Sequence, residues 1–450
     1  MLKSPTLPIR PPPPPPPPPP PRITTMTTST VLPSVTTKPY DIVAAAEALL
    51  EDAKRLAATI DQGSDNVPLR RKLAQTARTL AVETSHPLDA VKDEWLTTSG
   101  IAVWSLLTSW KAFDLIPLTA PGYITYADLA RQLDADESLI TRLITHLIAT
   151  GKLSPGPVPN SVSHSRLSPL YISTNPVSDL AVIAVGNGFK PFFQWPDYFS
   201  KYGRREPLGQ THTPFSFAWG HAELPPWEVK ALYPEYSASF KRSMQAKNIF
   251  GGDIPITGEG ALYDVSWVGS KKPTDENTVK IVDVGGGMGH LVKELLENVQ
   301  GLKPEECVLQ DRPDVIEGVE KTGDPGLKGV RFMSHDFHER QPVRGAWVYV
   351  LRRILLDYSD DLAVNILKQV AGALPDVDKD ARVLIVEFKL FEGIGQPPQN
   401  THVDLMMFNL GGKLRNETMY RDLVKKAGMR VVKYHVRAGD PHCVVECGKA

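Results

Sequence analysis

The stretch VKIVDVGGGMGHLVKELLE, residues 279–297, decides the fold. Its first residues are mostly apolar, which is typical of a buried strand, and four glycines follow within the five positions 285–289. Leucine and valine then recur at helical spacing. A strand, a glycine turn and a helix in this order bring the backbone within contact of a nucleoside ligand. We therefore expect an α/β domain that binds such a ligand at this turn.

An acidic residue, Asp283, stands just before the glycines. A carboxylate there would repel a pyrophosphate, which argues against a dinucleotide. S-adenosylmethionine carries an ammonium and a sulfonium group and no phosphate, so a carboxylate at the strand end suits it. The turn therefore predicts S-adenosylmethionine as the cofactor, with Gly285 and Gly287 contacting it.

Two further predicted strands end in acidic residues. ECVLQD ends at Asp311, which is placed to hydrogen-bond both ribose hydroxyls of a nucleoside. GVRFMSHDF ends in Asp336 and Phe337, which suit the amine and the ring face of adenine. A glycine turn alone is a weak motif, whereas three successive strand tips that carry Gly, Asp and Asp-Phe form a strong one.

The composition is that of an ordinary globular protein. Its 450 residues exceed what one compact domain usually holds, so we expect two or three domains. The formal charge of −1 gives no electrostatic case for binding nucleic acid or an acidic membrane. The three cysteines lack metal-site spacing, so we expect no metal and a reducing, cytoplasmic setting. No apolar run reaches the roughly 20 residues of a membrane helix, and no secretory signal is recognisable.

Prolines set the first expected boundary. Eleven of the 41 prolines form the uninterrupted run 11–21, which favours an extended polyproline II rod that cannot join a core. The threonine- and serine-rich residues after it add little apolar surface, so residues 1–38 are expected to be a disordered, proline-rich leader. A passive tail is favoured over a docking site for a proline-binding module.

Residues 39–180 are predicted to form a helical domain that ends in a winged helix. Apolar residues recur at three- and four-residue steps, for example near 67–83. Thr125 begins a helix-turn-helix pattern, and a wing is expected over residues 151–172. The region that would read DNA is acidic rather than basic, so DNA binding is not expected.

Residues 181–275 form an expected helical segment that is rich in aromatic side chains and proline. Each aromatic residue taken singly is explained as core. As a group they also suit the wall of a site for a flat, apolar ligand, and both interpretations remain open. The remaining residues, 276–450, are expected to form the cofactor domain. The aromatic residues in question are Trp195, Phe215, Phe217, Trp219, Trp227 and Phe240.

From about Tyr40 to the C-terminus the chain resembles the class I O-methyltransferases of fungal and plant type. The matching motifs, in order, are VDVGGGMGHL, LQDRPDVI, HDFHERQPVRGAWVYVLRRIL, DYSDDLAVNILKQVAGALP, RVLIVE and DLMMFNLGGKLRNETMYRDLVKKAGM. The resemblance implies a Rossmann-like α/β methyltransferase domain joined to an N-terminal winged-helix dimerisation domain, in a homodimer with a substrate cavity between the domains. It implies an S-adenosylmethionine site at Gly285, Gly287, Asp311, Asp336, Phe337 and Arg352.

The chain departs from the family at its catalytic positions. The family has a histidine general base where LRRILLDYSDD has Leu356, and a leucine cannot accept a proton. The contribution of about 10²–10⁴ that a positioned base supplies is therefore missing at this position. Of the two family glutamates around that histidine, Glu387 is kept, and the other is replaced by Leu414.

Three functions fit this pattern. The favoured one is a pericyclase, like the fungal O-methyltransferase-like pericyclases, which guides a cyclisation of a reactive polyketide or polyketide–amino acid intermediate. The alternative is an O-methyltransferase for a phenolic or enolic polyketide hydroxyl, which dispenses with the histidine because the substrate is acidic enough or because Asp357, His335 or His402 assists. The third is a non-catalytic binding protein. An apolar cavity without a base suits a concerted reaction that needs orientation rather than proton abstraction.

The expected substrate site combines polar and apolar residues. Asp357 and Glu387 are the polar groups that remain near the reacting centre, and each can hydrogen-bond a carbonyl or a neighbouring donor. His212, in the aromatic segment, is a further polar candidate. The side chains expected to shape the cavity are Leu356, Leu414, Met406 and Met407.

Overall fold

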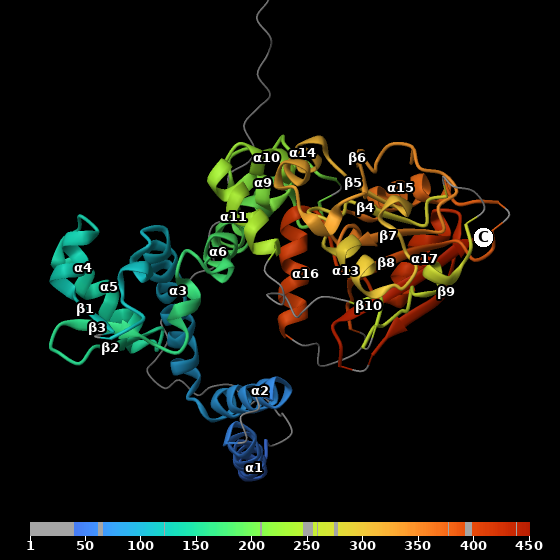
Figure 1. Cartoon of the computed structure of the whole chain (residues 1–450). Helices are drawn as coiled ribbons and strands as arrows, with labels where there is room; N and C mark the ends of the chain where they lie inside the picture. The colour runs from blue at the N-terminus through green and yellow to red at the C-terminus, as the bar shows by residue number, and fades with distance from the viewer. Residues whose placement is uncertain are drawn as a thin grey trace, which may run out of the picture. The chain divides into compact units, whose positions relative to one another are not determined.

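The computed structural model describes residues 40–61, 66–120, 122–207, 209–245, 255–258, 260–273, 278–376, 378–391, 398–437 and 439–450. The proline-rich leader lies outside the described residues. The chain divides into two compact units, Met1–Trp95 and Leu96–Ala450, and Figure 1 shows its elements in chain order. The boundaries expected near residues 180 and 275 stay predictions.

The first unit is helical. It contains α1 (Ile42–Asp61), α2 (Val67–Thr84) and the beginning of α3 (Pro87–Ser109). Helices α1 and α2 pack against each other, and the buried Asp52 carboxylate pairs with Lys72 at 2.7 Å. Several large apolar side chains of this unit are exposed: Ile42, Val43, Leu50, Ile60, Val67, Val82, Leu88 and Val91.

The second unit begins with a small α+β arrangement. Strands β1 (Tyr123–Thr125), β2 (Leu153–Pro155) and β3 (Ser161–His164) form an antiparallel sheet in the order β1-β3-β2. Helix α4 (Tyr126–Gln132) begins where the Thr125 hydroxyl accepts the Asp128 N–H, as the sequence predicts, and α5 (Glu137–Ala149) follows. Leucine and isoleucine side chains from α4 and α5 are buried together in this core.

A run of short helices follows. Their bounds are α6 (Asp179–Ile183), a π-helical turn (Ala184–Phe189), α7 (Lys190–Phe193), α8 (Trp195–Tyr202), α9 (Pro214–Ala218), α10 (Pro226–Ala231), α11 (Pro234–Gln245) and α12 (Trp267–Ser270). Prolines at the first turns of several of them suit a helix start, because the missing N–H has no intrahelical partner there. Phe215, Val229 and Tyr236 form a shared core with Leu410 of α16 (Pro398–Leu410).

The rest of the unit is built on a seven-stranded sheet in the order β6-β5-β4-β7-β8-β10-β9. The strands are β4 (Ile281–Val284), β5 (Cys307–Asp311), β6 (Arg331–Ser334), β7 (Val348–Arg352), β8 (Arg382–Phe388), β9 (Met429–Val436) and β10 (His442–Lys449). The pairs from β6 through β8 are parallel, and β10 is antiparallel to both β8 and β9. The helices packed on the sheet are α13 (His290–Asn298), α14 (Pro313–Thr322), α15 (Asp360–Ala371) and α17 (Glu417–Lys426).

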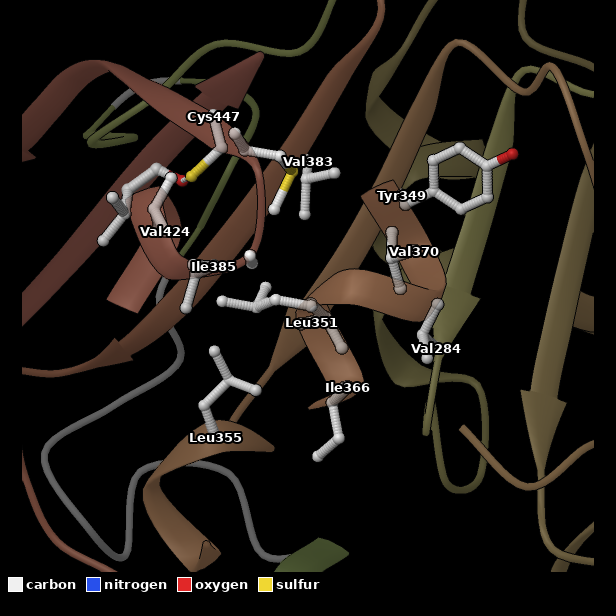
Figure 2. Packing of buried hydrophobic residues seen from close by; sticks show 14 of the residues in the cluster. Val284, Tyr349, Leu351, Leu355, Ile366, Val370, Val383, Ile385, Val424 and Cys447 are labelled. Carbon is white, nitrogen blue, oxygen red and sulfur yellow. Dashed lines mark hydrogen bonds between the residues drawn. The ribbon is translucent and has the colours of Figure 1, made fainter. Parts of the chain in front are cut away.

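Alternate residues of the central strands enter two different cores. On β7, Tyr349 and Leu351 join a core with α15 and α17, whereas Val348 and Val350 join a core with α13 and α14. Figure 2 shows the first core, with Leu351 beside Ile366 of α15. Because both faces are covered, the central strands β7 and β8 are buried along most of their length. None of the described helices is both long and apolar enough to cross a membrane.

Parallel strands place their carboxyl ends on one edge of the sheet. The residues that follow β4, β5, β6 and β7 therefore meet there, as expected for the ligand edge of an open α/β sheet. This edge carries the glycine turn and the acidic strand tips. The α/β fold predicted from the glycine turn is thus confirmed.

Candidate active site at the strand tips

The glycine turn after β4 needs its glycines for two different reasons. Gly285 and Gly287 have φ angles of +72° and +57°, a conformation that favours glycine. The N–H groups of Gly285 and Gly286 both donate to the Gln310 carbonyl, which fixes the turn against β5. A Cβ atom on Gly286 would lie 2.3 Å from Asp283 Oδ2, whereas one on Gly287 would meet no atom of the described residues within 4 Å. The space beside Gly287 is therefore open.

Asp283 lies beneath this turn and is almost fully buried. Within the described residues its Oδ2 atom has no hydrogen-bond partner. Burial raises the pKa of Asp283 to about 7, and the charge of Arg352 opposes the rise. A buried carboxylate oxygen without a partner is costly, so a cationic group beside it would stabilise the ionised form. The ammonium or sulfonium group expected of the cofactor fits this requirement.

Asp311 connects the tip of β5 to the glycine turn. Its Oδ2 accepts the Gly287 N–H at 2.8 Å, and its Oδ1 accepts the Arg312 N–H at 2.8 Å. Burial raises the pKa of this carboxyl group. Each oxygen of a carboxylate can accept a further hydrogen bond, so both remain able to bind ribose hydroxyls.

The third strand tip differs slightly from expectation. Strand β6 ends at Ser334, where it pairs with Asp311, so Asp336 and Phe337 lie beyond the strand rather than at its last residues. Asp336 Oδ1 accepts the His338 N–H, and the Phe337 ring lies edge-on to Tyr358 at 5.7 Å between centroids. A Cβ atom on Gly285 would be 3.4 Å from the Phe337 ring, which places this ring beside the glycine turn.

Arg352 ends β7 and is held by α13. Its Nη1 atom pairs with Glu294 Oε2 at 3.2 Å, and its charge also acts on Asp283. The structure thus brings Asp283, Asp311 and Arg352 to one region of the sheet edge, as the sequence predicts for a cofactor site. These roles stay predictions.

The turn after β7 carries the position of the missing histidine. It is a single 3₁₀ turn, Leu355–Asp357, fixed from beneath by Glu387 of β8. Glu387 Oε1 accepts the N–H groups of Ile354 and Leu355 at 3.0 and 2.8 Å. Its Oε2 has no partner among the described residues, and burial raises the pKa of Glu387 to about 8. Glu387 therefore supports the turn with one oxygen and keeps the other available.

Leu356 and Leu414 lie together in a small apolar cluster. Both are buried with Phe388, and Met407 packs against the same cluster. The Leu356 carbonyl accepts the Lys413 N–H at 2.9 Å, which joins the turn to the loop that carries Leu414. The two departures from the family pattern therefore lie together, in one buried apolar cluster at the position of the family's base.

Lys230 is a candidate that the sequence analysis missed. It lies on α10, is 3% exposed, and places Nζ 4.0 Å from the ring centroids of both Trp227 and Phe240. Its charge interacts with the half-buried Asp357, whose pKa burial raises to about 7. The motif PPWEVKAL offered one signal, a lysine among apolar and aromatic neighbours.

The remaining histidine and methionine candidates are more scattered. His212 lies in a surface loop, where its Nε2 atom is 3.0 Å from exposed Glu223. The His402 ring lies edge-on to Phe192, and Met406 lies near Gly188. His335 donates its backbone N–H to the Asp311 carbonyl. These contacts tie only His335 to the strand tips.

Comparison with known proteins agrees with this geometry. A family model described as an O-methyltransferase domain matches residues 205–430. Methyltransferase cfoD of Aspergillus candidus is 38% identical over 86% of this chain and 94% of its own length. Methyltransferase pynC of Aspergillus niger is 36% identical over 74% of this chain and 89% of its own.

Solved structures show the same fold. A pericyclic reaction enzyme has a TM-score of 0.75 at 23% identity and covers 91% of this chain and 99% of its own. LepI in complex with SAM has a TM-score of 0.75 at 23% identity, with 90% and 100% covered. OxaC with sinefungin and meleagrin has a TM-score of 0.76 at 20% identity, with 91% and 99% covered.

These comparisons agree with the cofactor that the strand tips predict, S-adenosylmethionine. At the identities observed, the solved structures establish the fold and leave the reaction open. The family match covers half the chain, and the first curated relative exceeds 30% identity over most of it. The chain is therefore a member of the O-methyltransferase domain family.

Proposed function

We propose that this protein is a S-adenosylmethionine-dependent methyltransferase that methylates an acidic oxygen, enolic or phenolic, of a small polyketide-type molecule. The observation that carries the proposal is the intact cofactor edge, where Asp283, Asp311 and the glycine turn converge. The curated relatives above 30% identity are named methyltransferases. The pericyclase first favoured from the sequence has its structural support at 23% identity, which extends to the fold alone.

The cofactor would be held by residues of three strand tips. Asp311 would bind the ribose hydroxyls, Phe337 the adenine face and Asp283 a cationic group, beside the open space at Gly287. When bound, the cofactor supplies an electrophilic methyl group. The buried position of Asp283 excludes water from this contact, which strengthens an ion pair there.

The chain's own polar groups would act on the acceptor. Burial raises the pKa of both Asp357 and Glu387. Glu387 can therefore be protonated near neutral pH and donate a hydrogen bond to a carbonyl of the acceptor, whereas Asp357 in its ionised form would accept a hydrogen bond from a neighbouring donor. The apolar cluster of Leu356, Leu414 and Phe388 would contact its carbon skeleton. An acidic acceptor needs little help to lose its proton, which is compatible with a leucine at position 356.

A pericyclic cyclisation is the second candidate. It is favoured by the same apolar cluster, because a concerted reaction needs shape and orientation rather than a base. In that reaction Asp357 or Glu387 would hydrogen-bond a carbonyl of the reacting molecule. The two candidates use the same residues and differ in whether the product gains mass.

One incubation separates the candidates. Purified protein and S-adenosylmethionine are added to an extract of a strain from which the gene has been deleted, and products are followed by mass spectrometry. Methyl transfer adds one methylene unit to a metabolite, whereas cyclisation changes retention time without changing mass. A mass gain that is lost in Asp311→Ala supports the proposal. A product of unchanged mass alone would replace it with the pericyclase.

A further inference from the structure

Lys230 has an environment that no part of the fold explains. The side chain is 3% exposed, yet Nζ makes no hydrogen bond with any described residue. Its closest neighbours are ring faces: Trp227 and Phe240 at 4.0 Å and Phe215 at 5.5 Å. An ammonium has three donors, and burying it without acceptors is costly.

The aromatic rings offset only part of this cost. A cation over a ring is stabilised by less than the hydration free energy that a buried ammonium loses. Burial accordingly lowers the pKa of Lys230 to about 7, Asp357 opposes this change, and Arg312 adds to it. Among the described residues no group accepts a hydrogen bond from Nζ, so its donors remain available to a ligand.

Lys230 lies close to the turn that follows β7. It projects from α10, which lies outside the cofactor-binding sheet, and it interacts with Asp357 of the turn after β7. Trp227, also on α10, interacts with the Tyr358 hydroxyl, and Tyr358 contacts Phe337. Helix α10 therefore lies beside the turn after β7 and beside Tyr358, which contacts Phe337.

We propose that Nζ of Lys230 takes the proton of the acceptor's acidic hydroxyl and then holds the resulting oxygen anion. The acceptor would be an enol or a phenol. The O–H bond breaks with its electron pair left on oxygen, an N–H bond forms, and the neutral amine becomes an ammonium. After the product leaves, the ammonium returns the proton to solvent. The role in methylation rests on the proposed function, whereas anion binding is tested without turnover.

This assignment accounts for the leucine at position 356. A base works best when its pKa lies near the working pH, and burial lowers the pKa of Lys230 from its ordinary value toward that range. Asp357 would stabilise the ammonium form after proton transfer, because it is the opposite charge that acts on Lys230. A proton acceptor is thus present on α10, beside the turn that carries Leu356 rather than on that turn.

The test uses 4-nitrophenol, whose phenolate absorbs at a longer wavelength than the phenol. The probe is titrated with the full-length protein and S-adenosylhomocysteine at a pH below the probe's own pKa, so that no methyl transfer occurs. Wild type should show the phenolate band. Lys230→Met keeps an unbranched side chain in the aromatic surroundings. It should lower the bound phenolate fraction about tenfold or more, which corresponds to a rise of about one unit in the pKa of the bound probe.

Two further variants make the test specific. Lys190→Met is the matched control, because Lys190 Nζ also lies over a ring, Trp219 at 3.8 Å, and it should keep the band. Lys230→Arg keeps the charge and should keep the band, while its permanent cation cannot accept a proton. If Lys230→Met does not fold, Lys230→Arg still tests the proposal. The methyl-transfer rate of wild type should rise with pH near 7, and the rate of Lys230→Arg should not.

The outcomes separate the two proposals. A wild type without the phenolate band, or a band unchanged in Lys230→Met, overturns the role of Lys230. Calorimetry should give equal S-adenosylmethionine affinities for wild type and Lys230→Met. If that affinity falls together with the phenolate band, Lys230 binds an anionic group of the cofactor, and the assignment to the acceptor is overturned. A phenolate band without methyl transfer in the extract supports anion binding and rejects the proposed methylation.

Discussion

Gly286 and Gly287 are neighbours, yet an added methyl group would meet different surroundings at each. A Cβ atom on Gly286 would collide with Asp283 and Leu309, both at 2.3 Å, whereas Gly287 faces open space. Gly286→Ala should therefore displace the buried carboxylate and lower S-adenosylmethionine affinity by at least tenfold. Gly287→Ala carries mainly the strain of a positive φ, about 1 kcal/mol. Calorimetry and thermal unfolding of both variants test this, and equal losses would contradict it.

Asp283 makes both cofactor binding and stability depend on pH. Its pKa is raised to about 7 in the folded protein, so the unfolded chain loses this proton at a lower pH than the folded one. Stability should therefore fall as the pH rises from about 4 to about 7 and then level off. Asp283→Asn should be more stable than wild type at pH 8, by about 1–3 kcal/mol, and should bind S-adenosylmethionine more weakly.

Denaturant unfolding of wild type and Asp283→Asn at pH 5 and pH 8 measures the first effect. Calorimetry at the same two pH values measures the second. The difference in stability between the two proteins should be small at pH 5 and larger at pH 8. A difference that does not change with pH would show that Asp283 does not titrate in this range.

Leu356→His with Leu414→Glu restores the family's polar pair. Both leucines are buried, so the glutamate would be buried beside Asp404, whose carboxylate already accepts the Leu414 N–H. This costs several kcal/mol unless the charge is paired, and the melting temperature should fall. Methyl transfer should continue or become faster, because a general base is regained. A cyclisation should become slower by an order of magnitude or more, because the apolar surface is lost.

The control for this pair is Leu356→His with Leu414→Gln, which has the same shape without the charge. Rates of both reactions on one extract decide the outcome. A slower cyclisation would contradict the methyltransferase proposal, whereas no change in either rate would show that neither leucine lies near the reacting atoms.

At the scale of elements, Arg415 fixes the turn that carries the missing base. Its guanidinium is fully buried and donates to the carbonyls of Leu355 and Tyr358, both at 2.8 Å, and to Asp360 at 2.9 Å. Arg415→Met would remove the side-chain donors to the Tyr358 carbonyl and to Asp360, and one of the two donors to the Leu355 carbonyl, which also accepts the Tyr358 N–H, so we expect a loss of about 2–4 kcal/mol in unfolding free energy. Arg421→Met removes an exposed pair with Glu417 and should cost less than about 1 kcal/mol.

Denaturant unfolding of the two arginine variants compares these costs. The Arg415 variant should also bind the acceptor more weakly, because Leu356 and Asp357 lie within the released turn. Similar stability losses for both variants would mean that the buried hydrogen bonds of Arg415 contribute little.

The elements with strong local patterns could be predicted from the sequence. The apolar run before the glycines became β4, and Thr125 caps α4, because both depend on neighbouring residues. The end of β6 could not be predicted, since a parallel strand ends where its partner ends, here at the Asp311–Ser334 pair. Lys230 could not be predicted either, because only the packing of α9, α10 and α11 surrounds it with aromatic rings.

At the scale of the whole molecule, the exposed apolar side chains of the first unit predict a homodimer. Val43 on α1 and Val82 on α2 are 67% and 68% exposed, and such surfaces are typical of interfaces. Light scattering at micromolar concentration should give about twice the chain mass of 49.5 kDa. Val43→Glu with Val82→Glu should shift the mass toward the monomer.

Leu118→Glu is the matched control for the dimer, because Leu118 is also exposed, at 65%, and lies outside the first unit. It should leave the measured mass unchanged. A monomeric wild type, or equal effects of the control and the double variant, would reject the first unit as the interface.

The position of β10 in the sheet has a genetic consequence. Every residue assigned to the candidate site precedes residue 442, yet β10 lies between β8 and β9 and bonds to both. A nonsense or frameshift allele that truncates the chain after β9 would keep the whole candidate site and still remove an interior strand. Two strand edges would then be left without partners, a condition that promotes aggregation. Such late truncations should behave as null alleles, whereas missense changes in exposed loops should be tolerated.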